Sequence, residues 1–211
     1  MGPKKKSLTA QTANWGGKIV PSRLFCYRWN RHITSLDRMR SRNMNDETRI
    51  PGFHIRTTSA EDVSQILSFI RELAEYEKLS HEVVATEDLL RQTLFGEDSK
   101  AEAVIGYFDE APVAMALFFH NYSTFLGRPG IYLEDLFVRP EMRGKGFGRE
   151  LLRYVAKIAV ERKCGRLEWA VLDWNEPAIQ FYRSLGAVAM DEWTVYRLTG
   201  DALRKVATDD N

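Results

Sequence analysis

The sequence predicts an α/β domain in which helices cover a mixed, largely antiparallel sheet of six to seven strands. Three observations lead to this fold class. Apolar residues recur at helical spacing over 63–74, and two segments of strand character flank a four-residue turn at 109–112. A glycine-rich turn at 143–148 joins an apolar strand to a long amphipathic helix. Along the chain, the expected elements follow the order β-α-α-β-β-β-α-β-α-β-β.

The first half of the domain contains a short strand and two capped helices. We expect the strand at 54–57, followed by Ser59 as the cap of the first helix. Asp62, three residues later, completes a partial capping box. Thr86 is expected to cap the second helix, and Gly96 ends it.

The second half alternates strands and helices. The glycine turn opens a helix from about 146 to 163, and Asn175 caps a further helix with Pro177 in its first turn and Gly186 just past its end. A last helical turn is expected at 202–206. The remaining strands are expected at 101–108, 113–120, 131–138, 166–172, 187–190 and 193–198.

The composition is that of a globular protein that needs neither disulfides nor a metal. Of 211 residues, 44% are hydrophobic and 28% are charged, and no apolar run reaches the roughly 18 residues of a membrane span. Cys26 and Cys164 are too few for a disulfide framework, and the four histidines lack metal-ligand spacing. We therefore expect no metal and a reducing, cytoplasmic location.

Charge divides the chain into two parts. Residues 1–49 carry a net charge of +8 and residues 50–211 a net charge of −7. We expect residues 1–50 to be a basic, disordered extension and residues 51–211 to form the folded domain, beginning near Pro51. An acidic domain attracts small cationic molecules through its long-range field.

Several interpretations of the basic extension stay open. It is a solvated tail, an organelle-targeting peptide or a nucleic-acid-binding arm. Trp15 and Trp29 lie among its basic residues, but their irregular spacing gives no RNA-binding signature, so we do not expect nucleic acid as a partner. Met39 or Met44 could also be the biological start.

The turn from Arg143 to Gly148 predicts a site for a pyrophosphate-bearing coenzyme. Backbone N–H groups at the start of a helix attract phosphate, and glycine lets the anion approach closely. The alternating glycines match neither the dinucleotide fingerprint nor the P-loop, and a ligand-free connection is the alternative. The nearby Lys145 and Arg149 favour a polyphosphate.

These motifs resemble a known superfamily. The strand, the R-x-x-G-x-G turn, its helix and the segment Asn-Glu-Pro-Ala-Ile-Gln-Phe-Tyr-Arg-Ser-Leu-Gly-Ala at 175–187 are similar to the GNAT N-acetyltransferases. Residues 132–138 and 172–177 resemble the branch of spermidine/spermine N1-acetyltransferases and thialysine acetyltransferases. The likeness covers about 54–200. It implies the GNAT fold, acetyl-CoA as cofactor, and a homodimer.

The resemblance also implies which residues contact the coenzyme. Backbone groups of Leu136, Phe137 and Val138 would bind the pantetheine arm as an added strand. The pyrophosphate would lie on Arg143, Gly144, Lys145, Gly146, Phe147, Gly148 and Arg149. The thiol end would lie beside Asn175, Glu176, Pro177 and Tyr182.

Two side chains are expected to be catalytic. Glu134 is a carboxylate on an apolar strand, which is costly to bury unless it is used. It is either an outward-facing position or a general base, because acetyl transfer needs a neutral amine. Asp135 points to the opposite face if the strand is regular, either in a structural role or as a charge that acts on the site without touching the substrate. Tyr182 is either a core aromatic or, as the resemblance implies, the general acid that protonates the CoA thiolate.

The amine site is expected to be acidic and aromatic. The resemblance implies amine contacts by Tyr76, Glu77, Glu134, Glu168, Trp169, Ala170 and Glu192. Each carboxylate taken alone is more often a solvated surface charge than an amine ligand. Together they suit a diamine, a polyamine or a thialysine-like amino acid, acetylated by direct transfer within a ternary complex. The alternatives are a protein lysine or N-terminal acetyltransferase and a non-catalytic acyl-CoA-binding module.

Overall fold

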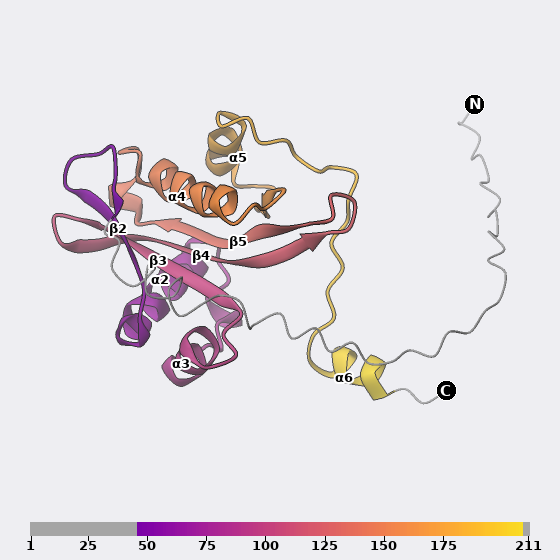
Figure 1. The fold of residues 1–211 in the computed structure, drawn as a ribbon. Coiled ribbons are helices and arrows are strands. Elements are labelled where there is room, and N and C mark those ends of the chain that lie inside the picture. The colour runs from indigo at the N-terminus through magenta and orange to yellow at the C-terminus, as the bar shows by residue number, and fades with distance from the viewer. Residues whose placement is uncertain (1–45, 209–211) are drawn as a thin grey trace, which may run out of the picture. The chain divides into compact units, whose positions relative to one another are not determined.

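The computed structural model describes residues 46–208 and contains one six-stranded sheet (Figure 1). Neighbouring strands lie in the order β1-β2-β3-β4-β5-β6, all antiparallel except the parallel pair β5-β6. The strands are β1 (Asp46–Glu47), β2 (Phe53–Thr57), β3 (Ala101–Phe108), β4 (Ala111–Ser123), β5 (Arg128–Val138) and β6 (Leu167–Trp169). This confirms the predicted mixed, largely antiparallel sheet, which begins with β1, ahead of the expected boundary at Pro51.

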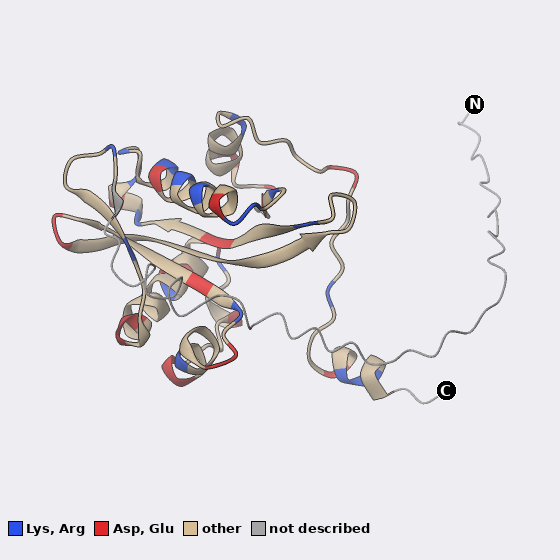
Figure 2. Ribbon diagram, viewed as in Figure 1, with Lys and Arg blue, Asp and Glu red and all other residues tan. Residues whose placement is uncertain are grey.

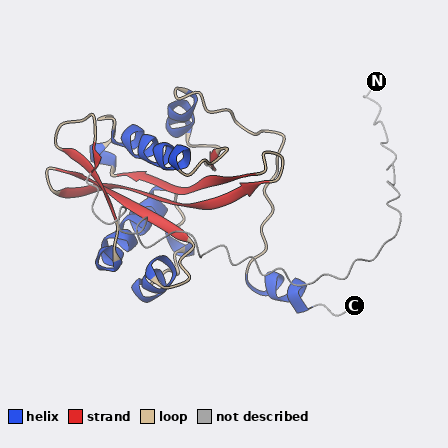
Figure 3. Cartoon of the chain, viewed as in Figure 1, coloured by secondary structure: helices blue, strands red, loops and turns tan. Residues whose placement is uncertain are grey.

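Helices cover both faces of the sheet, as Figure 3 shows: α4 and α5 lie on one face, and α2 and α3 on the other. The α-helices are α2 (Val63–Tyr76), α3 (Glu87–Phe95), α4 (Phe147–Glu161), α5 (Glu176–Arg183) and α6 (Gly200–Thr208). Short 3-10 helices are η1 (Ala60–Asp62), η2 (Ser80–Glu82) and η3 (Pro140–Met142).

The predicted caps are present. Ser59 and Asp62 form a complete capping box before α2, and the Thr86 hydroxyl accepts a hydrogen bond from the Leu89 N–H at the start of α3. Asn175 caps α5 by accepting from the N–H of Ala178. These local signals therefore fix where three helices start.

Each face of the sheet has its own apolar core. On the α4 face, Phe53 stacks on Phe147 with ring centroids 4.2 Å apart, and Leu151 is fully buried. On the other face, Phe69 of α2 packs against Phe137 of β5. Alternation along the strands supplies both cores, because successive side chains point to opposite faces.

The two strands expected at 187–190 and 193–198 are not formed, so that prediction was wrong. Their apolar side chains are exposed: Val188 by 83%, Trp193 by 70% and Tyr196 by 91%. The segment has strand-forming residues, but a strand needs a hydrogen-bonded neighbour, and a single copy of the chain offers it none within the described residues.

Strands β5 and β6 separate near the middle of β5. Their register pairs Ile131 with Leu167 and ends at the pair Leu133–Trp169. Beyond this point, residues 134–138 continue along β4 without β6 at their other edge. The separation leaves an open strand edge inside the sheet.

Residues 1–45 and 209–211 lie outside the described part, and with them nearly all of the predicted basic extension. Within 46–208, no helix combines the length and apolar character that crossing a membrane requires. The same residues contain no group of three or more His, Cys, Asp or Glu side chains arranged to hold a metal ion.

Candidate active site

A β-bulge shapes the acidic part of the site. Asp135 pairs with Leu117 on β4, whereas the next β4 residue, Phe118, pairs with Leu133. Glu134 is therefore the extra residue of β5 and stands without a partner in the ladder. The strand is irregular at this point, which corrects the expectation that Asp135 simply alternates with Glu134.

Two neighbouring carboxylates act on the Asp135 carboxylate at this bulge. Burial, together with the nearby charges of Glu134 and Glu77, raises the pKa of Asp135 to about 6. Burial also raises the pKa of Glu77, the residue that ends α2. Figure 2 shows the acidic segment in the middle of β5. The structure thus brings together Glu77 and Glu134, two of the predicted site residues, and adds Asp135.

The glycine turn has the geometry of an anion site. Gly144 and Gly146 have φ angles of +78° and +88°, which L side chains rarely adopt, and Gly146 is the residue that precedes α4. The Phe147 side chain is buried in the core and anchors the turn. The first N–H groups of α4 lack carbonyl partners within the helix, so the residues present fit a diphosphate.

Basic side chains surround the turn, each held at a different place. Arg149 donates to the Ser184 hydroxyl at 3.3 Å, and the Lys145 ammonium lies 5.5 Å from the centre of the Phe108 ring. All three predicted cations, Arg143 included, are exposed, and Arg143 turns back toward α2. The turn therefore combines backbone donors with exposed positive charge.

The open edge of β5 presents backbone groups of alternate residues. The Arg139 N–H donates to the Val113 carbonyl of β4 at 3.0 Å. Because strand residues alternate in direction, the N–H and C=O groups of Leu136 and Val138 point to the other edge, where β6 has separated. Phe137 has its backbone toward β4 and its side chain in the core.

Tyr182 lies on α5 and is half-buried. Its ring packs on Trp169 of β6, with centroids 4.9 Å apart, and on Phe181. Trp169 is the last residue of β6, so this contact places Tyr182 where β6 leaves β5, and Tyr182 packs against the same apolar core as Leu136 and Val138. Burial raises the pKa of Tyr182 to about 12, so the phenol keeps its proton at neutral pH.

The end of α2 is joined to the start of α5. The Tyr76 hydroxyl donates to Asn175 Oδ1 at 3.2 Å, and its ring lies 5.8 Å from that of Trp174. Glu176 and Pro177 form the exposed first turn of α5. Sequence reasoning did not single out Trp174, although it precedes the predicted cap.

The other predicted amine contacts are less well placed. Glu168 accepts a hydrogen bond from Asn121 at 2.6 Å and pairs with Arg166 at 2.8 Å, so its charge is already compensated. Ala170 is exposed just past β6. Glu192 lies in the exposed C-terminal segment, and no hydrogen bond or ion pair among residues 46–208 joins it to the carboxylates at the bulge.

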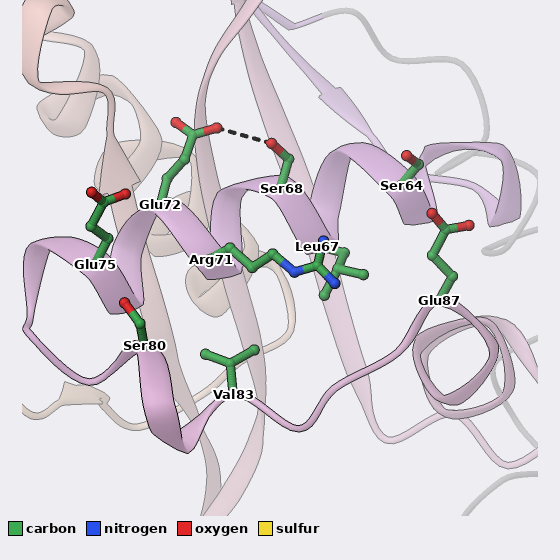
Figure 4. Close-up of a pocket in the computed structure, with 9 residues that line it drawn as sticks. All are labelled: Ser64, Leu67, Ser68, Arg71, Glu72, Glu75, Ser80, Val83 and Glu87. Atoms are coloured by element: carbon green, nitrogen blue, oxygen red, sulfur yellow. Dashed lines mark hydrogen bonds between the residues drawn. The ribbon is translucent and has the colours of Figure 1, made fainter.

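A separate groove of about 590 Å³ lies beside α2 (Figure 4). It is lined by Ser64, Leu67, Ser68, Arg71, Glu72, Glu75, Ser80, Val83 and Glu87. None of these is a predicted site residue. Glu72 is engaged by Ser68 and Arg139, and the groove has none of the tyrosine and backbone groups described above. The candidate active site is therefore the region where β5 and β6 separate.

The sheet that opens beside a glycine turn defines an acyltransferase fold, and the comparisons agree. Residues 65–187 match the acetyltransferase (GNAT) family. The chain belongs to this family and is an acetyl-CoA-dependent N-acetyltransferase.

Its relatives are enzymes that act on amines. The chain is similar to thialysine N-epsilon-acetyltransferase from Bos taurus, with 41% identity over 164 residues, 72% of this chain and 96% of the relative. It is 34% identical to L-ornithine N5-acetyltransferase from Arabidopsis thaliana, over 72% of this chain and 86% of the relative.

Solved structures have the same fold. An integron cassette protein from the mobile metagenome of V. cholerae superposes with a TM-score of 0.64 and 28% identity, covering 75% of this chain and 99% of that one. An aminoglycoside acetyltransferase from a soil metagenome superposes with a TM-score of 0.61 at 16% identity, covering 70% of this chain and 96% of that one, which supports the fold alone.

Proposed function

We propose that this enzyme acetylates the primary amine of a small cationic molecule by direct transfer from acetyl-CoA in a ternary complex. The observation that carries the proposal is the separation of β5 and β6 between the acidic bulge and Tyr182. Thialysine-like and ornithine-like amino acids are the first candidates, since the relatives that carry these names are 34–41% identical. Diamines and polyamines come second, because the spermidine/spermine acetyltransferase-like relative is only 29% identical.

The coenzyme would lie along the open edge and end at the glycine turn. The backbone groups of Leu136 and Val138 would pair with the pantetheine arm as a strand does. The diphosphate would accept hydrogen bonds from the turn and the first amides of α4, with Arg149 and Lys145 nearby. When bound, acetyl-CoA supplies the acetyl group as a thioester.

The chain's own groups would then move the protons. Glu134 would take the ammonium proton, directly or through water, while the neighbouring Asp135 and Glu77 hold the cation by charge. A backbone N–H at the open edge of β5 would stabilise the oxyanion that develops on the acetyl carbonyl. Tyr182, which keeps its proton at neutral pH, would donate that proton to the CoA sulfur as the C–S bond breaks and negative charge develops on the sulfur.

The proposal includes a homodimer in the cytoplasm. The segment 187–198 exposes a run of large apolar side chains, among them Trp193 and Tyr196, that a second copy would cover. Light scattering after gel filtration should give twice the mass of one chain. The double variant Trp193→Lys, Tyr196→Lys should instead give the mass of a single chain. If the parent chain is a monomer at the concentration used in the assay, the proposed homodimer is wrong. Imaging of a tagged full-length chain checks the location.

The test is release of CoA thiol with a panel of amines. Thialysine, ornithine, lysine, putrescine, spermidine, spermine and a lysine-containing peptide are each offered with acetyl-CoA. We expect the amino acids with an amine tail to give the highest kcat/KM. Preferred turnover of the peptide would instead favour a protein acetyltransferase, and coenzyme binding without any turnover a non-catalytic module.

A further inference from the structure

Arg143 connects the coenzyme turn with the proposed amine site. Its guanidinium carbon lies 4.1 Å above the centre of the Tyr76 ring, and its Nε donates to the Val138 carbonyl at 3.0 Å. Of the three cations at the turn, it is the one that reaches α2 within the described residues. Its side chain therefore reaches from the coenzyme turn to Tyr76, a proposed contact of the amine substrate.

Tyr76 is in turn tied to the catalytic helix. Its hydroxyl donates to Asn175, whose Oδ1 also caps α5 through the Ala178 N–H. α5 carries Tyr182. Next to Tyr76, Glu77 acts on Asp135 at the bulge. The contacts thus connect the glycine turn through Tyr76 and Asn175 to the helix that carries Tyr182.

The face of an aromatic ring attracts one cation at a time. A guanidinium over the Tyr76 ring uses the same negative quadrupole that a substrate ammonium would use. Arg143 is permanently charged, so it also repels a second cation beside it. In this arrangement Arg143 competes with the amine for Tyr76.

A phosphate would change that competition. Charge-assisted hydrogen bonds between arginine and phosphate are stronger than an exposed cation–π contact. We propose that Arg143 is a positioning residue that couples the two substrates: it covers the Tyr76 cation site until the coenzyme diphosphate draws it toward the turn. This inference rests on the proposed function and adds an order, with coenzyme binding favouring amine binding.

The coupling must be reciprocal, because it is a free energy shared by two ligands. The amine that gives the best turnover in the panel is titrated calorimetrically with and without saturating CoA, which carries the diphosphate but no acetyl group. We expect CoA to tighten amine binding by about fivefold or more, and the amine to tighten CoA binding by the same factor.

Arg143→Met removes the charge and keeps the length of the side chain. We expect this variant to bind the amine without CoA nearly as tightly as the parent does with CoA, so that the ratio falls to about one. Arg149→Met is the matched control, because it removes a cation of the same turn that contacts Ser184 instead of Tyr76. It should weaken CoA binding. The ratio of amine affinity with saturating CoA to amine affinity without CoA should stay at the parental value.

The outcomes separate the two proposals. A parent enzyme that turns the amine over but binds it equally with and without CoA overturns the coupling alone. An Arg143→Met variant that keeps the parental ratio and melting temperature also overturns it. Absence of turnover with every amine would remove the proposed function and this inference together.

Discussion

The proposed coenzyme side and the proposed amine side of this active site are built differently. The coenzyme side comes from one stretch, the end of β5, the turn and the start of α4, and Phe147 anchors it in the core. The amine side is assembled from the end of α2, the bulge of β5 and the start of α5. A contiguous motif supplies its own geometry, whereas the amine side depends on tertiary contacts.

This difference explains what each side can do. Backbone amides on a helix start bind the constant part of a substrate, the diphosphate, whatever side chains surround them. Side chains from separate elements set charge and shape one by one, so they decide which amine is accepted. The comparison predicts that changes on the coenzyme side act on all amines alike, and that changes on the amine side act on selectivity and pH dependence.

The largest effect is expected from Tyr182→Phe, where the two sides meet. Loss of the proton donor should lower kcat by about 10²–10⁴-fold for every amine, because general acid catalysis contributes that much. Acetyl-CoA affinity, measured calorimetrically, should change by less than about threefold, since the ring packing on Trp169 is kept. Tyr122→Phe, an exposed tyrosine on β4, is the control. Equal kcat in both variants would remove Tyr182 as the acid.

On the amine side, Asp135→Asn should raise the free energy of unfolding of the protein, but only at pH values where Asp135 is ionised. The folded-state pKa of Asp135, about 6, lies above its ordinary value of 3.8, so ionisation costs stability as the pH rises through this window. The variant should gain on the order of 1–3 kcal/mol in unfolding free energy at pH 7.5 and almost none at pH 3.5.

Urea unfolding at the two pH values measures this gain, and the same variant should lose turnover of cationic amines. Glu134→Gln is the companion, because removing the neighbouring charge lowers the pKa of Asp135. A gain for Asp135→Asn that is the same at both pH values would contradict the raised pKa.

Gly148→Ala should weaken the coenzyme side without touching stability. A Cβ at this position has room inside the protein, with the nearest atom, on Val138, 3.6 Å away, and the φ angle is not positive. We expect acetyl-CoA affinity to fall by about tenfold, as a methyl group would stand where the phosphate approaches.

Gly127→Ala is the opposite control. Its φ of +61° makes alanine strained although space is open, so stability should fall by roughly 1 kcal/mol with coenzyme binding unchanged. Isothermal titration and thermal melting of both variants give the two numbers. If the two alanines had the same effect on acetyl-CoA affinity, the turn would not be the binding site.

The smallest effect concerns the ion pair that joins the two sides. Arg139, just after β5, makes two hydrogen bonds to Glu72 of α2, at 2.9 and 3.0 Å, and lies over the Phe69 ring. Arg139→Met should cost about 0.5–1 kcal/mol, since the pair is partly exposed and screened. Arg91→Met, which breaks exposed pairs on α3, should cost less. Denaturant unfolding measures both losses: the midpoints should fall, while the dependence of the unfolding free energy on denaturant concentration should stay the same.

Most of the fold could be predicted from local signals, including the glycine turn on which the coenzyme site is proposed. Ser59, Thr86 and Asn175 mark where helices begin, and the predicted glycine turn is present, with positive φ angles at Gly144 and Gly146. Each of these signals acts within a few residues. They are therefore visible in the sequence itself.

The amine side was less accessible for a physical reason. The bulge at Glu134 depends on the register between β4 and β5, and no local sequence pattern predicts that register. The raised pKa of Asp135 could therefore not be predicted. The contact between Arg143 and Tyr76 joins residues far apart in the chain. The prediction of strands at 187–190 and 193–198 was wrong for a similar reason: strand propensity does not tell whether a neighbouring strand is present to pair with.

The central claim is that backbone amides after β5 hold the coenzyme diphosphate. Hydrogen exchange of the intact protein, read by mass spectrometry with and without CoA, tests it most directly. The account predicts strong protection of peptides covering 136–149, with the amides at 144–149 slowed most and the groove beside α2 unchanged. Exchange at 144–149 that is the same with saturating CoA would contradict it.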